Sequence, residues 1–357
     1  MTDRKRPRRW PLMLGAVLVA LVLVGGLNLN LLRMIFYSNY DPLNPLDVEG
    51  EWAGGTAYRN VRYADISESD YLNLYVPQGV DNPPLIVAIH GGGFVLNDCE
   101  SRQAQLFYQY FRDHGYAVAT INYRLAQEAV FPAAVEDVKC AIRFLKANAA
   151  AYGYDASKVT VWGESAGGYL AVMAGATTDE EFNGLPFIGE DALEAPVSSR
   201  VDAVLDYYGA VRLESRGDRN AAFAALGVPA FVVDMAGGWL RDPIKDMPWA
   251  QTCEDAWMGK PFDALTEAEN EAVQPMTYVR RNLHGQKPLA VLILHGDADI
   301  TVPVTQSQQL YDTLKAQNGA NPLTLEIVRN AKHADEGLYS DAKLAEVARW
   351  LEAALSR

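Results

Sequence analysis

The chain lacks an excess of positive charge, because 31 Lys and Arg residues stand against 45 Asp and Glu residues in 357, a formal net charge of −14. Binding to nucleic acid needs clustered Lys and Arg that neutralise phosphates, so we expect no nucleic-acid partner. The acidity is assigned to solubility. Charged residues are interspersed and 49% of the residues are hydrophobic, which favours a substantial folded core over disorder.

Cysteine is also scarce: Cys99, Cys140 and Cys253 form no C-x-x-C pair and have no metal-ligand spacing. We therefore expect no metal site. An exported domain would allow one disulfide and one free thiol, and three small buried side chains would fit the sequence as well. A G-K-[ST] sequence is missing after the glycines at 91–93, which argues against a phosphate-binding loop.

The first 40 residues form a separate unit. Five cations lie within residues 1–9, and the stretch over residues 10–32 carries no charge. A bilayer is crossed by roughly 20 apolar residues, and cations before such a stretch keep that end in the cytoplasm. We expect a cytoplasmic tail over 1–9 and a transmembrane signal anchor over 10–32, which places the rest of the chain outside the cell membrane.

A cleaved signal peptide has the same order of charged and apolar residues. However, no A-x-A site follows the apolar stretch, and residues 24–26 give the only passable cleavage context. The stretch also exceeds the signal-peptide core of about 7–15 residues. The sequence favours the uncleaved anchor, with secretion after cleavage as the alternative.

Residues 33–51 are expected to form a connector broken by prolines, and residues 52–357 to form one domain. Apolar runs typical of strands alternate with helical periodicities. The runs are 61–65, 71–76, 85–89, 117–121, 159–162, 201–207, 289–294 and 323–328, and the clearest helices are 103–113, one starting at 131–132, 168–174 and 343–355. This alternation predicts an α/β fold with a mostly parallel sheet and helices on both faces.

Residues 209–288 do not fit this repeating unit. The interval is too long for a simple connection and, with its Trp and Met residues, too apolar for a disordered loop. We interpret it as a cap inserted over the active site, because long ordered insertions are often lids. A purely structural insertion rich in aromatic residues is the alternative.

Ser165 stands at the centre of Gly163-Glu164-Ser165-Ala166-Gly167, between a predicted strand and a predicted helix. This G-x-S-x-G pattern predicts a nucleophile elbow, which exposes the serine hydroxyl at a sharp turn. A serine hydroxyl needs a base to become a strong nucleophile. His333 is the preferred base, since it lies in a polar turn after the last predicted strand. The other histidines are His90, His114, His284 and His295.

Asp299 is the preferred acid, because a carboxylate that accepts a hydrogen bond from His333 would fix its tautomer. Asp297 is the nearest competitor, and a turn-forming function suits it better. Asp335 and Glu336 lie too close in sequence to His333 to orient it.

Gly92 and Gly93, in the sequence His90-Gly91-Gly92-Gly93, are the predicted oxyanion donors, together with the N–H of Ala166. Acyl transfer places negative charge on the carbonyl oxygen, and preorganised N–H groups stabilise that charge. A flexible glycine-rich turn is the alternative for this loop.

With these motifs the chain resembles the α/β-hydrolase superfamily. Within it, the resemblance is to the carboxylesterases near hormone-sensitive-lipase-like enzymes and feruloyl or acetyl xylan esterases. The matching segments lie at 90–94, 122–125, 131–137, 163–168, 295–299, 302–303 and 333. The resemblance implies an α/β-hydrolase fold and a Ser165–His333–Asp299 triad, with Gly92, Gly93 and Ala166 lining the oxyanion hole.

The expected activity is hydrolysis of short acyl or small aromatic carboxylic esters through a serine acyl-enzyme, with no cofactor. A small-molecule ester is the expected partner, and the sequence leaves the oligomeric state open. A serine peptidase of the prolyl-oligopeptidase type is one alternative, although 357 residues leave no room for its usual propeller. A catalytically silent binding protein is another, although no triad residue is missing.

Overall fold

The computed structural model describes residues 52–236, 240, 242–247, 249–283, 289–317 and 321–356. The chain divides into two compact units, Met1–Tyr40 and Asp41–Arg357, and all described residues belong to the second. The expected tail, anchor and connector (1–9, 10–32 and 33–51) lie outside the described residues. Within the described ranges, no helix has both the length and the apolarity that crossing a membrane requires.

Eight strands form one sheet in the order β1-β2-β4-β3-β5-β6-β7-β8. β1 and β2 pair antiparallel, as do β2 and β4, and all other neighbours are parallel, which confirms the predicted mostly parallel sheet. The strands are β1 (Gly55–Arg62), β2 (Tyr71–Pro77), β3 (Pro84–Ile89), β4 (Ala117–Ile121), β5 (Asp155–Glu164), β6 (Ala203–Tyr207), β7 (Ala290–Gly296) and β8 (Leu323–Val328).

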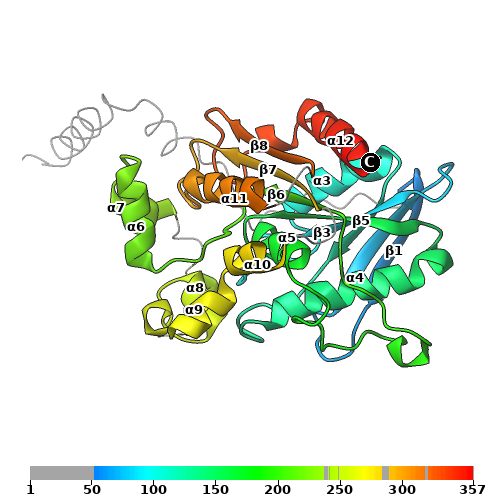
Figure 1. The fold of residues 1–357 in the computed structure, drawn as a ribbon, viewed down its shortest axis with the longest axis horizontal. Coiled ribbons are helices and arrows are strands. Elements are labelled where there is room, and N and C mark those ends of the chain that lie inside the picture. Colours follow the sequence, from blue (N-terminus) through cyan, green and yellow to red (C-terminus); the bar gives the residue numbers. More distant parts are fainter. Residues whose placement is uncertain are drawn as a thin grey trace, which may run out of the picture. The chain divides into compact units, whose positions relative to one another are not determined.

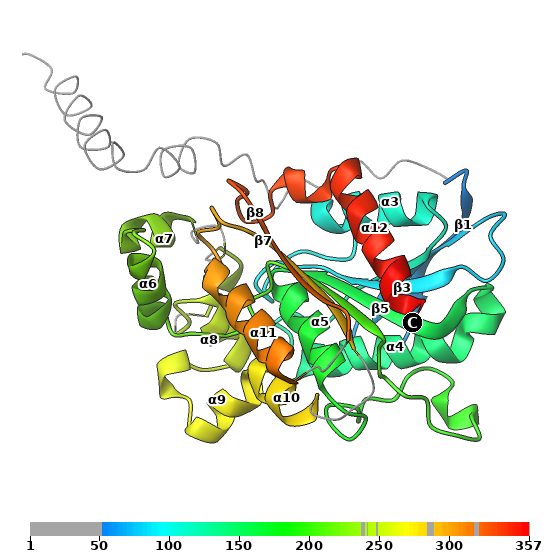
Figure 2. The same ribbon diagram turned by 45° about the horizontal axis from the view of Figure 1, so that its top comes forward.

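Helices cover both faces of this sheet (Figure 1). Figure 2 shows α3 and α12 on one side and α4, α5, α10 and α11 on the other. The helices are α3 (Arg102–Asp113), α4 (Ala133–Tyr152), α5 (Ala166–Ala176), α6 (Arg216–Ala225), α7 (Ala230–Ala236), α8 (Cys253–Met258), α9 (Glu267–Val273), α10 (Pro275–Asn282), α11 (Val304–Gln317) and α12 (Asp341–Leu355). This arrangement confirms the predicted α/β fold with helices on both faces of the sheet.

The central strands are buried on both faces, which explains why they are continuous apolar runs in the sequence. All five residues of β4 and of β6 are buried. Aromatic side chains fill the layer under α3, where Phe107 stacks on Trp162 of β5 with ring centroids 4.1 Å apart. Because β5, β6, β7 and β8 pair in parallel, their carboxyl ends lie in a row at one edge of the sheet.

The first strand differs from the prediction. The sequence indicated residues 61–65, whereas β1 is Gly55–Arg62 and bends at Asn60, whose φ is +53°. β1 is an edge strand and none of its residues is fully buried. Hydrophobic alternation therefore does not mark it, and its position depends on pairing with β2. The other predicted strands overlap observed ones.

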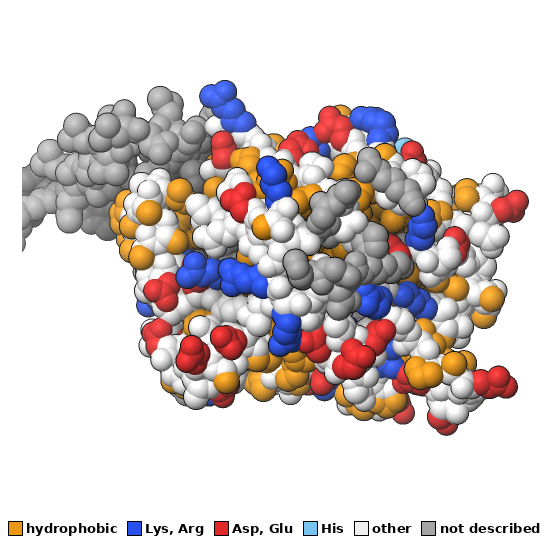
Figure 3. Space-filling model, in the orientation of Figure 1, with side chains coloured by type: hydrophobic (Ala, Val, Ile, Leu, Met, Phe, Trp, Pro, Cys, Tyr) orange, Lys and Arg blue, Asp and Glu red, His pale blue; other side chains and the backbone are white. Residues whose placement is uncertain are grey.

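On the face seen in Figure 3, Lys and Arg side chains are mixed with Asp and Glu side chains, in line with the interspersed charges of the sequence. The three cysteines are free and buried. The structure therefore corresponds to the alternative of three small buried side chains. Burial raises the pKa of the Cys140 thiol to about 12.

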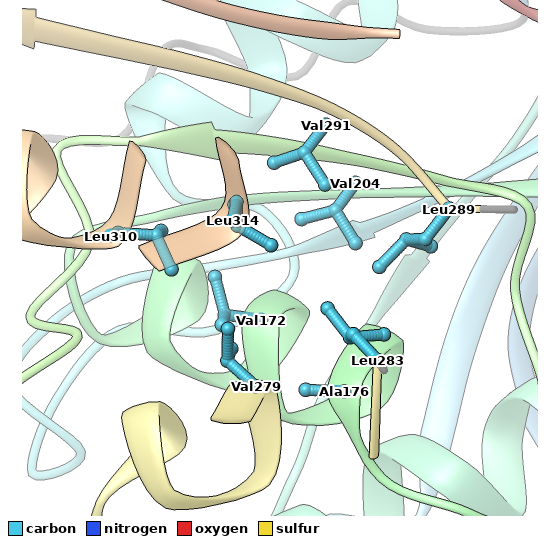
Figure 4. A pocket seen from close by; sticks show the side chains of 9 residues that line it. All are labelled: Val172, Ala176, Val204, Val279, Leu283, Leu289, Val291, Leu310 and Leu314. Carbon is cyan, nitrogen blue, oxygen red and sulfur yellow. The ribbon is translucent and has the colours of Figure 1, made fainter. Parts of the chain in front are cut away.

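A small apolar cavity lies between the sheet and α5, α10 and α11 (Figure 4). Its lining consists of aliphatic side chains alone: Val172, Ala176, Val204, Val279, Leu283, Leu289, Val291, Leu310 and Leu314. Such a lining offers a substrate no side-chain hydrogen bond, so we regard the cavity as a feature of core packing.

Candidate active site

The three residues proposed from sequence as a catalytic triad meet at the carboxyl edge of the sheet. Ser165 follows β5, Asp299 follows β7 and His333 follows β8. His333 Nε2 lies 3.0 Å from Ser165 Oγ, and His333 Nδ1 lies 2.7 Å from Asp299 Oδ2. Open α/β sheets form their sites at this edge, because the loops after parallel strands converge there. The three side chains thus form one hydrogen-bonded chain.

Ser165 occupies a strained turn between β5 and α5. Its φ of +54° and ψ of −117° are rare for a residue with a side chain. A Cβ at Gly163 would lie 2.0 Å from Gly167 O, and a Cβ at Gly167 would lie 2.1 Å from Ile89 O. Only glycine fits at these two positions, which gives the G-x-S-x-G pattern its steric reason. The turn places the hydroxyl at the N-terminus of α5.

Asp299 is held as an acceptor by several donors. Its Oδ1 accepts hydrogen bonds from the backbone N–H groups of Thr301 at 2.7 Å and Val302 at 2.9 Å. Its Oδ2 faces His333 and, at 3.1 Å, His295 Nε2. The carboxylate side chain is fully buried. A buried carboxylate with this many donors is fixed in orientation and stays charged.

The electrostatics of the pair favour a charged acid next to a basic imidazole. Burial raises the pKa of Asp299, but the charge of His333 and the hydrogen bonds from His295 and His333 outweigh it, so this pKa lies far below its ordinary value. Burial lowers the pKa of His333, and the Asp299 carboxylate overcomes this effect and raises it above the ordinary 6.5. His333 is therefore a stronger base than a free imidazole.

The competing acid, Asp297, has a different environment. It is exposed, and its Oδ1 accepts a hydrogen bond from the backbone N–H of Asn330 at 2.6 Å. This contact ties together the two turns that carry Asp299 and His333. Asp297 thus has the turn-forming function that the sequence favoured for it.

None of the other histidines that the structure describes takes the place of His333. The buried His90 ring stacks on Tyr123 with centroids 4.3 Å apart, and the exposed His114 ring stacks on Tyr110. His284 lies outside the described residues. His295 is buried next to Asp299, a contact that the sequence did not predict.

The predicted oxyanion loop adopts a conformation that requires glycine. Gly92 has a φ of +113°, and a Cβ there would lie 2.2 Å from Leu96 O. Gly93 has a φ of +59°, and Ala166 is the first residue of α5. Within the described part of the chain, the N–H groups of Gly92, Gly93 and Ala166 have no hydrogen-bond acceptor. All three donors are thus free for an oxygen of a substrate.

Glu164, the residue before the serine, was not identified from sequence as part of the site. Its buried Oε1 accepts a hydrogen bond from the Gly91 N–H at 2.7 Å, which ties β5 to the glycine loop. Burial raises the pKa of Glu164, and the charge of His333 and the Gly91 hydrogen bond oppose this rise. In turn, the negative charge of Glu164 adds to the raised pKa of His333.

This contact predicts a shift in the pH dependence of activity. Neutral His333 must accept a proton, so kcat/KM should rise with pH along a limb whose midpoint lies above 6.5. Glu164→Gln keeps an oxygen for the Gly91 N–H and removes the charge that raises the pKa of His333. We expect the limb to move to lower pH, measured from kcat/KM profiles of both proteins. A limb that stays in place or moves upward would contradict the assigned coupling.

Part of the 209–288 insertion packs on the glycine loop. Leu240, Ile244, Cys253 and Ala256 form a buried cluster with Val95 and Leu96, which follow Gly93, and with Ala126, which follows β4. Trp257 is fully buried and stacks on Phe94 with centroids 4.2 Å apart. The insertion therefore contacts the segment that carries two of the predicted oxyanion donors.

Known proteins that are similar to this chain include ester hydrolases. The chain is 34% identical over 126 residues to carboxylesterase NlhH of Mycobacterium tuberculosis, which covers 34% of this chain and 38% of that protein. It is 37% identical over 106 residues to an ethyl acetate hydrolase of Pseudomonas putida, covering 29% of this chain and 33% of that protein. The matches thus span less than half the length of these curated relatives.

Among solved structures, a truncated carbohydrate esterase from gut microbiota is similar, with a TM-score of 0.67 and 25% identity. The alignment covers 87% of this chain and 100% of that one. The sequence profile of the BD-FAE family matches residues 72–314, which include Ser165 and Asp299. The resemblance to esterases with an α/β-hydrolase fold is confirmed, and the chain belongs to the BD-FAE family.

Proposed function

We propose that this protein hydrolyses carboxylic esters through a covalent acyl-enzyme on Ser165. The observation that carries the proposal is the chain of two hydrogen bonds, 3.0 Å from Ser165 to His333 and 2.7 Å from His333 to Asp299. In addition, the N–H groups of Gly92, Gly93 and Ala166 have no acceptor among the residues that the structure describes. Relatives named as a carboxylesterase and an ethyl acetate hydrolase, and a structural neighbour named as a carbohydrate esterase, add support.

The reaction follows from these contacts. His333 Nε2 accepts the proton of Ser165 Oγ as the oxygen attacks the ester carbonyl, and Asp299 stabilises the imidazolium that forms. The N–H groups of Gly92, Gly93 and Ala166 donate to the carbonyl oxygen as it becomes negative. His333 then gives its proton to the leaving alcohol. Water, deprotonated by the same imidazole, then attacks the acyl carbonyl, and His333 returns that proton to Ser165 Oγ as the bond to the acyl group breaks and the acid leaves.

The proposal is tested by a panel of p-nitrophenyl and aryl esters together with a fluorophosphonate that labels activated serines. We expect ester hydrolysis and a covalent adduct whose peptide maps to Ser165 by mass spectrometry. A protein that neither turns over esters nor forms the adduct would favour the silent binding protein. Cleavage of peptides with no ester hydrolysis would favour the peptidase.

For the substrate, we propose short acyl or small aromatic esters. The apolar insertion packs tightly on the glycine loop, and a confined apolar pocket gains about 0.8 kcal/mol per buried methylene only until it is full. We expect kcat/KM on p-nitrophenyl esters to peak at short chains and to fall steeply by the dodecanoyl ester. Activity that still rises at the palmitoyl ester would indicate an open lipid-binding groove instead.

We further propose that the insertion acts as a cap whose Leu240 limits this pocket. A Cβ at Gly93 would lie 2.8 Å from Leu240 Cδ2, so this side chain directly faces the glycine loop. Leu240→Ala should move the peak in acyl length toward longer chains. Leu314→Ala, at the distant cavity of Figure 4, is the matched control. It should lower the free energy of unfolding, by about 2–5 kcal/mol, without moving the peak. If the dependence of kcat/KM on acyl length were the same in both variants, the insertion would have a purely structural function.

For localisation, we propose that residues 10–32 hold the protein in the cell membrane with residues 52–357 on the outer side. The support is the charge pattern of the sequence. Full-length protein should fractionate with membranes, and protease added to intact spheroplasts should digest the hydrolase domain. Protection of the domain would overturn the orientation, and a soluble form whose N-terminus lies near residue 27 would show cleavage.

A further inference from the structure

A second imidazole contacts the carboxylate that orients His333. His295, at the end of β7, is fully buried, and its Nε2 lies 3.1 Å from Asp299 Oδ2 and 3.1 Å from the carbonyl oxygen of Val302. Both of these oxygens are acceptors, so Nε2 must carry a proton. On the other side of the ring, Nδ1 lies 2.7 Å from Ser307 Oγ in α11, a hydroxyl that is able to donate.

We propose that His295 is a positioning residue for catalysis: it donates from Nε2 to Asp299 and so holds the carboxylate in the orientation that His333 needs. The inference rests on the proposed ester hydrolysis and adds a fourth residue to its machinery. His295 does not touch the reacting atoms. It acts through Asp299, whose Oδ2 it shares with His333.

The geometry gives this contact a specific effect. The two backbone donors on Asp299 Oδ1 come from the turn that follows β7, and a carboxylate held only there is free to tilt about that side. His295 contacts the opposite oxygen and also the Val302 carbonyl of the same turn. Because its ring is fixed by β7 and by Ser307, it connects the strand, the turn and α11. The carboxylate is thus held at both oxygens.

The charged groups around His295 bear on any pH measurement. Asp206, from β6, is buried, and burial raises its pKa to about 7. Its Oδ1 accepts a hydrogen bond from the Gly209 N–H at 3.0 Å, and its Oδ2 has no partner within the described residues. The Tyr208 ring lies 6.4 Å from His295 and 4.8 Å from His333. A pH profile of activity must therefore distinguish the titration of Asp206 from that of His333.

The test compares two replacements of His295. His295→Phe fills the space of the ring without a donor, whereas His295→Gln places an amide N–H near the position of Nε2. In His295→Phe we expect kcat to fall about 10-fold or more with KM nearly unchanged, since a buried charge-assisted hydrogen bond is lost. His295→Gln should recover most of kcat. His114→Phe makes the same chemical change at an exposed histidine away from the triad and is the matched control with little expected effect.

The pH profile distinguishes positioning from general stability. Asp299 with one donor fewer attracts the proton of His333 more strongly, so the acid limb of kcat/KM should move to higher pH in His295→Phe. In His295→Gln it should return toward the wild type. The same shift in an Asp206→Asn background assigns the limb to His333. Equal losses of activity and melting temperature in both His295 variants, without a shift of the limb, would overturn the proposal.

A second readout does not depend on a variant that folds. In the ¹H–¹⁵N spectrum of the wild-type protein, His295 should carry its proton on Nε2, and a proton on Nδ1 alone would overturn the inference. Failure of the proposed function is recognised separately, because the wild-type protein would then neither turn over esters nor form the adduct on Ser165, whichever nitrogen of His295 carries the proton.

Discussion

Replacing Ser165 by Ala should lower kcat for ester hydrolysis by about 10⁴–10⁶, the range found when a triad residue is removed. Among the described residues the hydroxyl makes one side-chain hydrogen bond, to His333 Nε2, so its loss removes the attacking atom and little else. His333→Ala should have an effect of similar size. The two losses should not add in the double variant, because the serine and its base act as one unit.

Steady-state kinetics on one activated ester, with the melting temperature of each variant, check this result. His114→Ala is the matched control, because His114 is an exposed histidine whose ring stacks on Tyr110 away from the triad. It should leave kcat unchanged. Residual turnover in Ser165→Ala within 10-fold of the wild type would exclude Ser165 as the nucleophile, even if the fold were intact.

The elements that the sequence predicted well are those fixed by local patterns. The turn at Ser165 depends on sterics within five residues, since Gly163 and Gly167 face backbone atoms where a Cβ does not fit. Buried parallel strands such as β4 are apolar on both faces and therefore continuous in sequence. The chain order of serine, acid and histidine then placed Asp299 and His333 at neighbouring strand ends, because β7 and β8 pair in parallel.

The features that could not be predicted from the sequence depend on contacts between distant segments. Glu164 stands at a position of the G-x-S-x-G pattern that accepts any residue, and its function follows from a hydrogen bond to Gly91, 73 positions away. His295 is the penultimate residue of β7, and the sequence gives it no function beyond that of a buried side chain. Its contact with Asp299 arises because the turn after β7 folds back against the strand. The edge strand β1 has no apolar pattern and is defined by its partner.

Asp299→Asn is the second large effect that we expect, a fall of about 10⁴ in kcat. The amide keeps the shape of the carboxylate, but it offers one oxygen and one NH₂ group to four donors. Oδ1 faces two backbone N–H groups, which favour the amide oxygen there. The NH₂ group would then face His333 Nδ1, donate to it and hold the imidazole in the tautomer with its proton on Nε2, which is unable to accept from Ser165.

Asp297→Asn is the matched control, because it makes the same chemical change two residues away. Asp297 Oδ1 accepts from the Asn330 N–H, and an asparagine oxygen does the same, so kcat should stay close to that of the wild type. Both variants are compared by kcat on one ester and by melting temperature. If Asp297→Asn were the more damaging of the two, the acid would be Asp297. The 2.7 Å contact between Asp299 and His333 would then hold the turn in place without orienting the base.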